Sequence, residues 1–262
     1  VVSGEQSDDA DPDAVRTTLA VLNATNYKGH VVVELKRHAL SDTLHAVSRG
    51  RALAVTGPHV IAQVTAEVCR YHGMSEVYQD LFDFDGDEIY FHSEPGLVGR
   101  SFGDAVQAFE TSSLLGLRGA DGGIRLAPPA ETVLAEGDML IAISEDDDTI
   151  VLVPGAQPAT ITAQTFQEST AATPVLLLGW NQLALPLLAQ LDRRLPAGSQ
   201  IMVCDLEPPD ASIQLQRCTL SVHQGDPQDH ATLQRLVRER PYHTIAVLSG
   251  RARSVADDDS RN

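Results

Sequence analysis

Short apolar runs alternate with stretches of helical periodicity in the first and last thirds of the chain. Runs rich in β-branched residues and leucine predict buried strands over His30–Leu35, Arg51–Val55, Pro174–Leu178, Gln200–Cys204 and Thr244–Leu248. Apolar residues recur with the helical period over Asp13–Leu22, Ser41–Val47, Pro58–Tyr71, Leu183–Leu195 and Asp229–Arg240. Apolar strands that alternate with helices predict an α/β fold with Rossmann-like parallel sheets covered on both faces.

The middle of the chain has a different pattern, in which turn residues separate short strands. We predict a helix near Ser101–Phe109 and strands over Glu88–His92, Ser113–Leu117, Gly123–Leu126 and Met139–Ile143. This order predicts a small α+β lobe between the two Rossmann-like parts. Pro154–Thr173 is rich in Pro, Ala, Thr and Gln and is the best candidate for a linker.

The composition describes an acidic globular protein. Apolar residues make up 43% of the chain, and 36 Asp and Glu against 19 Lys and Arg give a net charge of −17. This charge argues against nucleic acid and anionic membrane surfaces, both of which attract cationic proteins. It suits cation binding, although a solvated acidic surface gives the same balance.

The three cysteines are odd in number and form no CxxC pair, so neither a disulfide framework nor a zinc site is predicted. No apolar run approaches the length of a membrane span.

A strand-to-helix turn carries the frame of a nucleotide site. The sequence from Gly179 to Ala184 lies where a Rossmann GxGxxG belongs, but Asn181 replaces the second glycine. Asp205 follows the next strand, and Gly225 and Asp226 follow the third. These residues predict either an altered site for a nucleotide such as NAD or ATP, or a scaffold that has lost its ligand. Asn181 would then cap the following helix.

Acidic runs are the second kind of candidate site, because calcium prefers six to eight oxygen ligands. Glu145 and Asp146 begin one run directly after a strand. Asp257, Asp258 and Asp259 form another run near the carboxyl terminus. The first run is insufficient for calcium without oxygens from other chain segments, and the alternative for the second is a set of helix N-terminal acids. The acids between Asp83 and Glu88 do not fit an EF-hand, because the expected glutamate is missing from loop position twelve.

The sequence offers little support for catalysis. It contains no GxSxG and no HExxH motif, and Cys69 lies among apolar residues of a predicted helix. We therefore predict that the protein is not an enzyme and has no catalytic residues.

A series of segments follows a recognisable order along the chain: Tyr27–Glu34, Val60–Gln63 ahead of Cys69-Arg70, Leu81–Phe91, Leu134–Leu140, Ser144–Thr149, Leu178–Asn181, Leu191-Asp192 and Ala256–Asn262. These segments resemble the RCK domain (regulator of potassium conductance, also called the TrkA type), and more narrowly the CASTOR/POLLUX family of ion channels and its bacterial relatives. Their order and spacing, more than any single motif, carry the resemblance.

The resemblance implies a domain order. Residues 1–87 would form the second half of a first Rossmann-like RCK lobe, and residues 88–155 a small α+β RCK C-lobe. Residues 156–173 would be the linker, and residues 174–262 the first half of a second Rossmann-like lobe. Val2-Ser3-Gly4 and Leu248-Ser249-Gly250, each followed by spaced aspartates, are consistent with such a tandem repeat.

The resemblance also implies a function. The chain would be the cytosolic gating-ring region of a tetrameric cation channel, on the cytoplasmic face of the membrane, and would couple binding of calcium or a nucleotide to pore opening. Its partners would be other copies in the ring and a membrane pore domain of the same full-length chain. A crossover helix pair around Pro58–Tyr71 and the segment following Gly73 would join the copies. The alternatives are a soluble TrkA-type regulatory subunit of a potassium transporter and an NAD-dependent oxidoreductase.

Overall fold

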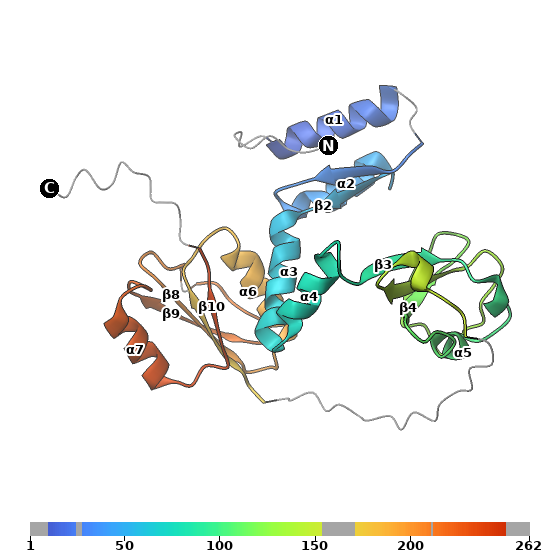
Figure 1. Ribbon diagram of the computed structural model, residues 1–262. Coiled ribbons are helices and arrows are strands. Elements are labelled where there is room, and N and C mark those ends of the chain that lie inside the picture. The colour runs from blue at the N-terminus through green and yellow to red at the C-terminus, as the bar shows by residue number, and fades with distance from the viewer. Residues whose placement is uncertain (1–9, 25–27, 154–170, 211, 250–262) are drawn as a thin grey trace. The chain divides into compact units, whose positions relative to one another are not determined.

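The computed structural model describes residues 10–24, 28–153, 171–210 and 212–249 (Figure 1). The chain divides into two compact units: Val1–His72 together with Glu168–Asn262, and Gly73–Gln167. The predicted domain boundaries stay predictions. The repeated segments at residues 2–4 and 250, and most of the predicted linker, lie outside the described residues.

The first lobe of the larger unit has a two-stranded parallel sheet. Its elements are α1 (Ala10–Ala24), β1 (Val31–Glu34), η1 (His38–Leu40), α2 (Ser41–Ser48) and β2 (Ala52–Val55). Val31 and Val33 alternate inward and share a core with Leu22 of α1 and Leu44 of α2. The opposite face of the sheet exposes apolar side chains, among them Leu53.

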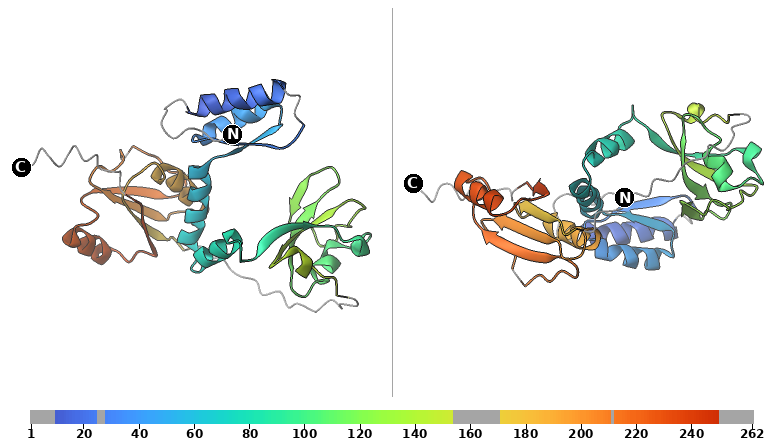
Figure 2. Two further views of the ribbon diagram at one scale, coloured as in Figure 1. Left: turned by 45° about the horizontal axis from the view of Figure 1, so that its top comes forward. Right: turned by 90° about the horizontal axis from the view of Figure 1, so that it is seen from below.

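Helix α3 (Gly57–Arg70) follows β2 directly but packs on the second lobe. Pro58 lies in its first turn, where a missing amide costs nothing. Ala62, Ala66 and Cys69, which recur with the helical period, are buried in one core with residues of α6 and the second sheet. Figure 2 shows α3 beside this sheet. The Thr244 hydroxyl also donates to the Cys69 carbonyl at 2.7 Å.

The second lobe has a four-stranded parallel sheet with helices on both faces. The strand order is β10-β7-β8-β9. Helices α3 and α6 cover one face, and Leu236 of α7 packs on the other. The elements are β7 (Pro174–Leu178), α6 (Ala184–Arg194), β8 (Gln200–Asp205), β9 (Thr219–Gln224), α7 (His230–Glu239) and β10 (Thr244–Val247). This doubly wound arrangement confirms the predicted α/β fold with Rossmann-like sheets.

The smaller unit is an α+β lobe whose antiparallel sheet has the order β3-β6-β4-β5. Its core contains Phe102, Leu117 and Leu140. Ser101 and Asp104 form a capping box that begins its central helix, α5. The elements are α4 (Met74–Phe82), β3 (Glu88–His92), η2 (Pro95–Leu97), α5 (Phe102–Val106), β4 (Ser113–Arg118), β5 (Ile124–Leu126), β6 (Met139–Ser144) and η3 (Asp147–Thr149). The described residues include no helix long and apolar enough to cross a membrane.

Candidate functional site

The structure brings the five predicted nucleotide residues to one edge of the second sheet. Gly179 and Gly225 follow the carboxyl ends of β7 and β9, and Asp205 is the last residue of β8, which lies between them in the parallel sheet. The Gly179 amide donates to the Cys204 carbonyl at 2.9 Å, and the Gly225 amide donates to the Asp205 carbonyl at 3.0 Å. This edge, at a crossover of strand order, is where open α/β sheets bind ligands.

Gly179 is required by the geometry of the turn. Its φ of +93° lies in the left-handed region. A Cβ at this position would lie 2.5 Å from the Leu248 carbonyl oxygen, at the end of the neighbouring strand β10. Backbone cannot yield as a flexible side chain can, so glycine is needed here for both conformation and space.

Asp205 anchors the turn that it faces. One carboxylate oxygen accepts from the Trp180 amide at 2.8 Å, and the other accepts from the Glu207 amide at 2.9 Å. In a dinucleotide site, the turn amides would face a pyrophosphate and this carboxylate would hold ribose hydroxyls. Here the amide of Trp180 and the carboxylate of Asp205 bind each other, so a nucleotide would have to replace that hydrogen bond.

Asn181 connects the turn to the end of β10. Its side-chain amide donates to the Ser249 carbonyl at 2.8 Å, and its oxygen accepts from the Leu183 amide at 2.9 Å. The second interaction closes a local turn before α6. The N-cap of α6 is Leu183 and it makes no side-chain cap hydrogen bond, so the predicted capping by Asn181 is not found. The side chain crosses from β7 to β10 where a glycine would leave the backbone open, so the residues present fit a dinucleotide poorly.

Gly225 and Asp226 begin the connection to α7. The Gly225 carbonyl accepts from the Cys204 thiol at 3.6 Å, and the Asp226 carboxylate accepts from the Gln228 amide at 2.8 Å. Burial, followed by the charges of Asp205 and Asp226, raises the pKa of the Cys204 thiol. The thiol is therefore a protonated, weak donor within this edge of the sheet.

The acidic candidates have local roles where the structure describes them. Asp146 caps η3: its carboxylate accepts from the Asp147 amide at 2.7 Å. Within the described ranges, no three His, Cys, Asp or Glu side chains form a group that could hold a metal ion. Asp257, Asp258 and Asp259 lie outside the described residues. A cation role for them, and for Glu145 and Asp146, stays a prediction.

Asp192 on α6 has a structural role that the sequence analysis did not identify. Its buried carboxylate accepts from the amides of Gln216, Arg217 and Cys218, each at 2.8 Å. Burial raises the pKa of Asp192, but the three backbone hydrogen bonds outweigh burial and leave the pKa below its ordinary value. The carboxylate thereby fixes the chain that enters β9. Its sequence signal is an acid directly beside the apolar stripe of α6.

The fold is similar to that of a channel gating ring. The chain is similar to the structure of the human SLO3 gating ring, with a TM-score of 0.62 and 12% identity. The match covers 94% of this chain and 54% of that one. Identity at this level shows the fold alone.

Sequence comparison then identifies the family that the chain resembles. Residues 58–160 match the family model described as Castor and Pollux, part of voltage-gated ion channel. The chain is 26% identical to the probable ion channel POLLUX of Arabidopsis thaliana over 99% of this chain, and 28% identical to the probable ion channel CASTOR of Oryza sativa subsp. japonica over 74% of it. The matches span 33% and 22% of those relatives, so the chain is about a third of their length or less. The predicted resemblance to CASTOR/POLLUX-type channels is confirmed.

Proposed function

We propose that this chain is the cytosolic gating-ring region of a tetrameric cation channel that couples ligand or cation binding to pore opening. The gating-ring fold and the family match support this role. The proposal includes a membrane pore domain in the same full-length chain. It also places this region on the cytoplasmic face of the membrane and takes potassium as the permeant ion. The role is regulatory rather than catalytic, in keeping with similar proteins that are named as ion channels.

The observation that carries the proposal is the position of α3. This helix begins two residues after β2 of the first lobe, yet Ala62, Ala66 and Cys69 are buried in the core of the second lobe. Arg194 of α6 pairs with Glu67 of α3. A rigid helix that joins two lobes transmits any change in their relative arrangement.

A ligand can change the arrangement of the two lobes only if its affinity differs between the arrangements. If it binds one arrangement of the lobes more tightly than another, it shifts the population toward that arrangement. The carboxyl edge of the second sheet is the candidate position for this binding. Asp205 and Asn181 tie the turn there to itself and to β10, so a ligand that replaces these hydrogen bonds would change the packing between β7 and β10.

Exposed apolar side chains on α4 support assembly into a ring. Val77 and Phe82 are 50% and 72% exposed, and α4 has no buried residue. A helix with an exposed apolar face is expected to bury that face in an assembly. The helix pair α3–α4 is therefore the proposed contact between copies.

Light scattering of the 262-residue chain tests the assembly. We expect a mass that rises with concentration beyond that of one copy. Phe82→Asp should shift the chain toward the monomer, because a charge in an apolar contact is costly. Leu126→Asp, at a side chain of β5 that is 66% exposed, is the matched control and should change nothing. A monomer at every concentration, or equal effects of the two variants, would contradict the proposed assembly.

Flux measurements on the full-length protein in liposomes test the coupling. We expect potassium flux that depends on calcium in the internal buffer. Ala66→Leu overfills the buried contact of α3 and should reduce this dependence while flux remains. Ala46→Leu, on an exposed position of α2, is the control. Absence of cation flux would refute the channel role, and unchanged ligand dependence in Ala66→Leu would refute transmission through α3.

A further inference from the structure

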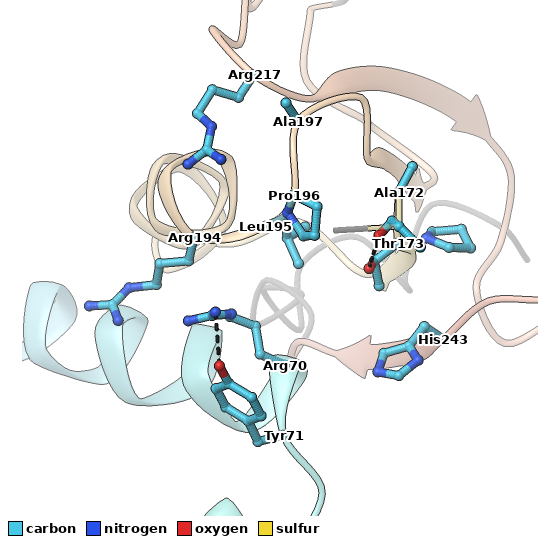
Figure 3. A pocket seen from close by; sticks show the side chains of 12 residues that line it. Arg70, Tyr71, Ala172, Thr173, Arg194, Leu195, Pro196, Ala197, Arg217 and His243 are labelled. Atoms are coloured by element: carbon cyan, nitrogen blue, oxygen red, sulfur yellow. Dashed lines mark hydrogen bonds between the residues drawn. The ribbon is translucent and has the colours of Figure 1, made fainter. Parts of the chain in front are cut away.

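A cavity opens at the amino edge of the second sheet, at the opposite strand ends from the candidate ligand site. Its volume is about 610 Å³, which lies within the range of small-molecule sites in proteins. It is lined by Arg70 at the end of α3, Thr173 before β7, Arg194 at the end of α6, Arg217 before β9 and His243 before β10. Five segments that are distant in sequence thus meet around one space (Figure 3).

The cavity concentrates positive charge in a chain whose net charge is −17. Arg70 donates to Glu67 at 3.3 Å, and Arg194 pairs with the same carboxylate. Arg217 donates to the Arg193 carbonyl at 2.5 Å rather than to a carboxylate. Glu67 is therefore shared by two of the three guanidinium groups. Arg70 and Arg194 are only 20% and 30% exposed, so solvent screens them incompletely.

The cationic groups are held in place before any ligand arrives. The Arg70 guanidinium lies 4.7 Å from the centre of the Tyr71 ring and donates to its hydroxyl at 3.0 Å. The Arg217 backbone is fixed by the buried carboxylate of Asp192. Fixed donors lose less freedom on binding, and planar guanidinium groups match the oxygens of a phosphate in pairs.

Capping of the α6 C-terminus explains only part of this arrangement. Arg217 satisfies a carbonyl in the last turn of α6, as cationic residues commonly do at helix ends. A guanidinium has five N–H donors, so Arg217 keeps donors for a ligand after that hydrogen bond forms. Arg70 lies in the last turn of α3, so the carboxyl ends of two helices present cationic residues to the same cavity.

We propose that this cavity is a binding site for a small phosphate-bearing anion. Its guanidinium groups would bind the phosphate oxygens, and Thr173 and His243 would add polar contacts at the rim. The same chemistry is offered by a soluble phosphorylated compound and by a phosphorylated lipid headgroup. The inference does not depend on the proposed channel role.

Calorimetric titration of the 262-residue chain with inorganic triphosphate tests the site. We expect binding that weakens as salt rises, because the contacts are ionic. Arg217→Gln should lower the affinity about tenfold or more, since a charge-assisted pair of hydrogen bonds is lost. Arg217→Lys keeps the charge without the planar group, so its affinity for triphosphate should lie between those of the unmodified chain and Arg217→Gln. Arg238→Gln removes the same charge from an exposed position of α7 and should bind like the unmodified chain.

Co-sedimentation with vesicles of phosphatidylcholine and phosphatidylinositol bisphosphate identifies the source of the phosphate. Vesicle binding that Arg217→Gln abolishes would assign a lipid headgroup, and triphosphate binding alone would assign a soluble compound. If Trp180 fluorescence shows that Arg217→Gln does not fold, Arg194→Gln takes its place. The proposal is overturned if neither probe binds, or if the cavity variant and Arg238→Gln weaken binding equally.

Discussion

Replacement of Asp192 by Asn tests how a single buried carboxylate holds the second lobe together. Asn keeps the size of the side chain and one acceptor oxygen but replaces the other oxygen with an amide donor. One oxygen of Asp192 accepts from Arg217 and Cys218, and the other accepts from Gln216. In the variant, the new amide would face the Gln216 amide, so two donors would oppose each other in a partly buried position.

The magnitude follows from these three hydrogen bonds. A hydrogen bond to a charged group contributes about 1.5–3 kcal/mol, and a buried donor left without an acceptor costs about 1–3 kcal/mol. Asn can keep the two bonds at one oxygen in weaker, uncharged form and loses the third. We expect Asp192→Asn to lower the free energy of unfolding by about 2–4 kcal/mol.

Urea unfolding, monitored by tryptophan fluorescence, measures the change in the free energy of unfolding of the second lobe. Trp180 is the single tryptophan of the chain and lies in the second lobe, so its signal reports on that lobe. Asp210→Asn is the matched control. Asp210 is exposed and its carboxylate accepts from the Ser212 amide, so the same substitution should cost only about 0.5–1 kcal/mol there.

The pH dependence gives an independent test. The folded pKa of Asp192 lies below the ordinary value of 3.8, so its stabilising effect is complete above that value and is lost as pH falls through the folded pKa. The stability difference between the unmodified chain and Asp192→Asn should therefore shrink on acidification. A constant difference across this range, or equal effects of Asp192→Asn and Asp210→Asn at neutral pH, would refute the reasoning.

Two further outcomes are expected from glycine and cysteine positions. Gly179→Ala should lower the free energy of unfolding by about 2 kcal/mol or more, because it adds a clash with the Leu248 carbonyl to the strain of a positive φ. Gly198 has a φ of +82° and open space around the added Cβ, so Gly198→Ala should cost only about 1 kcal/mol when both variants are unfolded in urea. Equal costs for the two variants would refute the role of the clash. Burial raises the pKa of Cys69 and Cys218 to about 11, so both thiols should resist alkylation by iodoacetamide at neutral pH until denaturant is added. Rapid labelling of the native chain, detected by mass spectrometry, would contradict this burial.

The apolar runs predicted most of the regular structure because packing in a doubly wound sheet leaves a strong local pattern. Pro174–Leu178 is buried almost throughout, and its apolar sequence predicts a strand without information on the strands that pair with it. Thr219–Gln224 is also a strand, β9, but it lies at the edge of the sheet and contains Thr, Ser, His and Gln. This segment is a strand because its backbone pairs with β8. Its side chains are too polar to form an apolar run, so the hydrophobic pattern does not predict it.

The site residues were predictable only where they followed strands. Gly179 and Asp205 were found because a parallel fold fixes where such residues meet. The hydrogen bond between Asn181 and Ser249 joins strands that the sequence separates widely. Arg70 and Arg217 converge on one cavity only through the packing of α3 on the second lobe, and no spacing within the sequence signals that contact.

The hydrogen bond from the Thr244 hydroxyl to the Cys69 carbonyl has a consequence for biosynthesis. Helix α3 is made early, but the strand that binds its end is made near the close of the described chain. The apolar stripe of α3 therefore remains without its native cover until the second sheet emerges from the ribosome, and contacts of such long range form slowly. A nascent chain halted before residue 174 would be expected to expose this stripe and to attract chaperones.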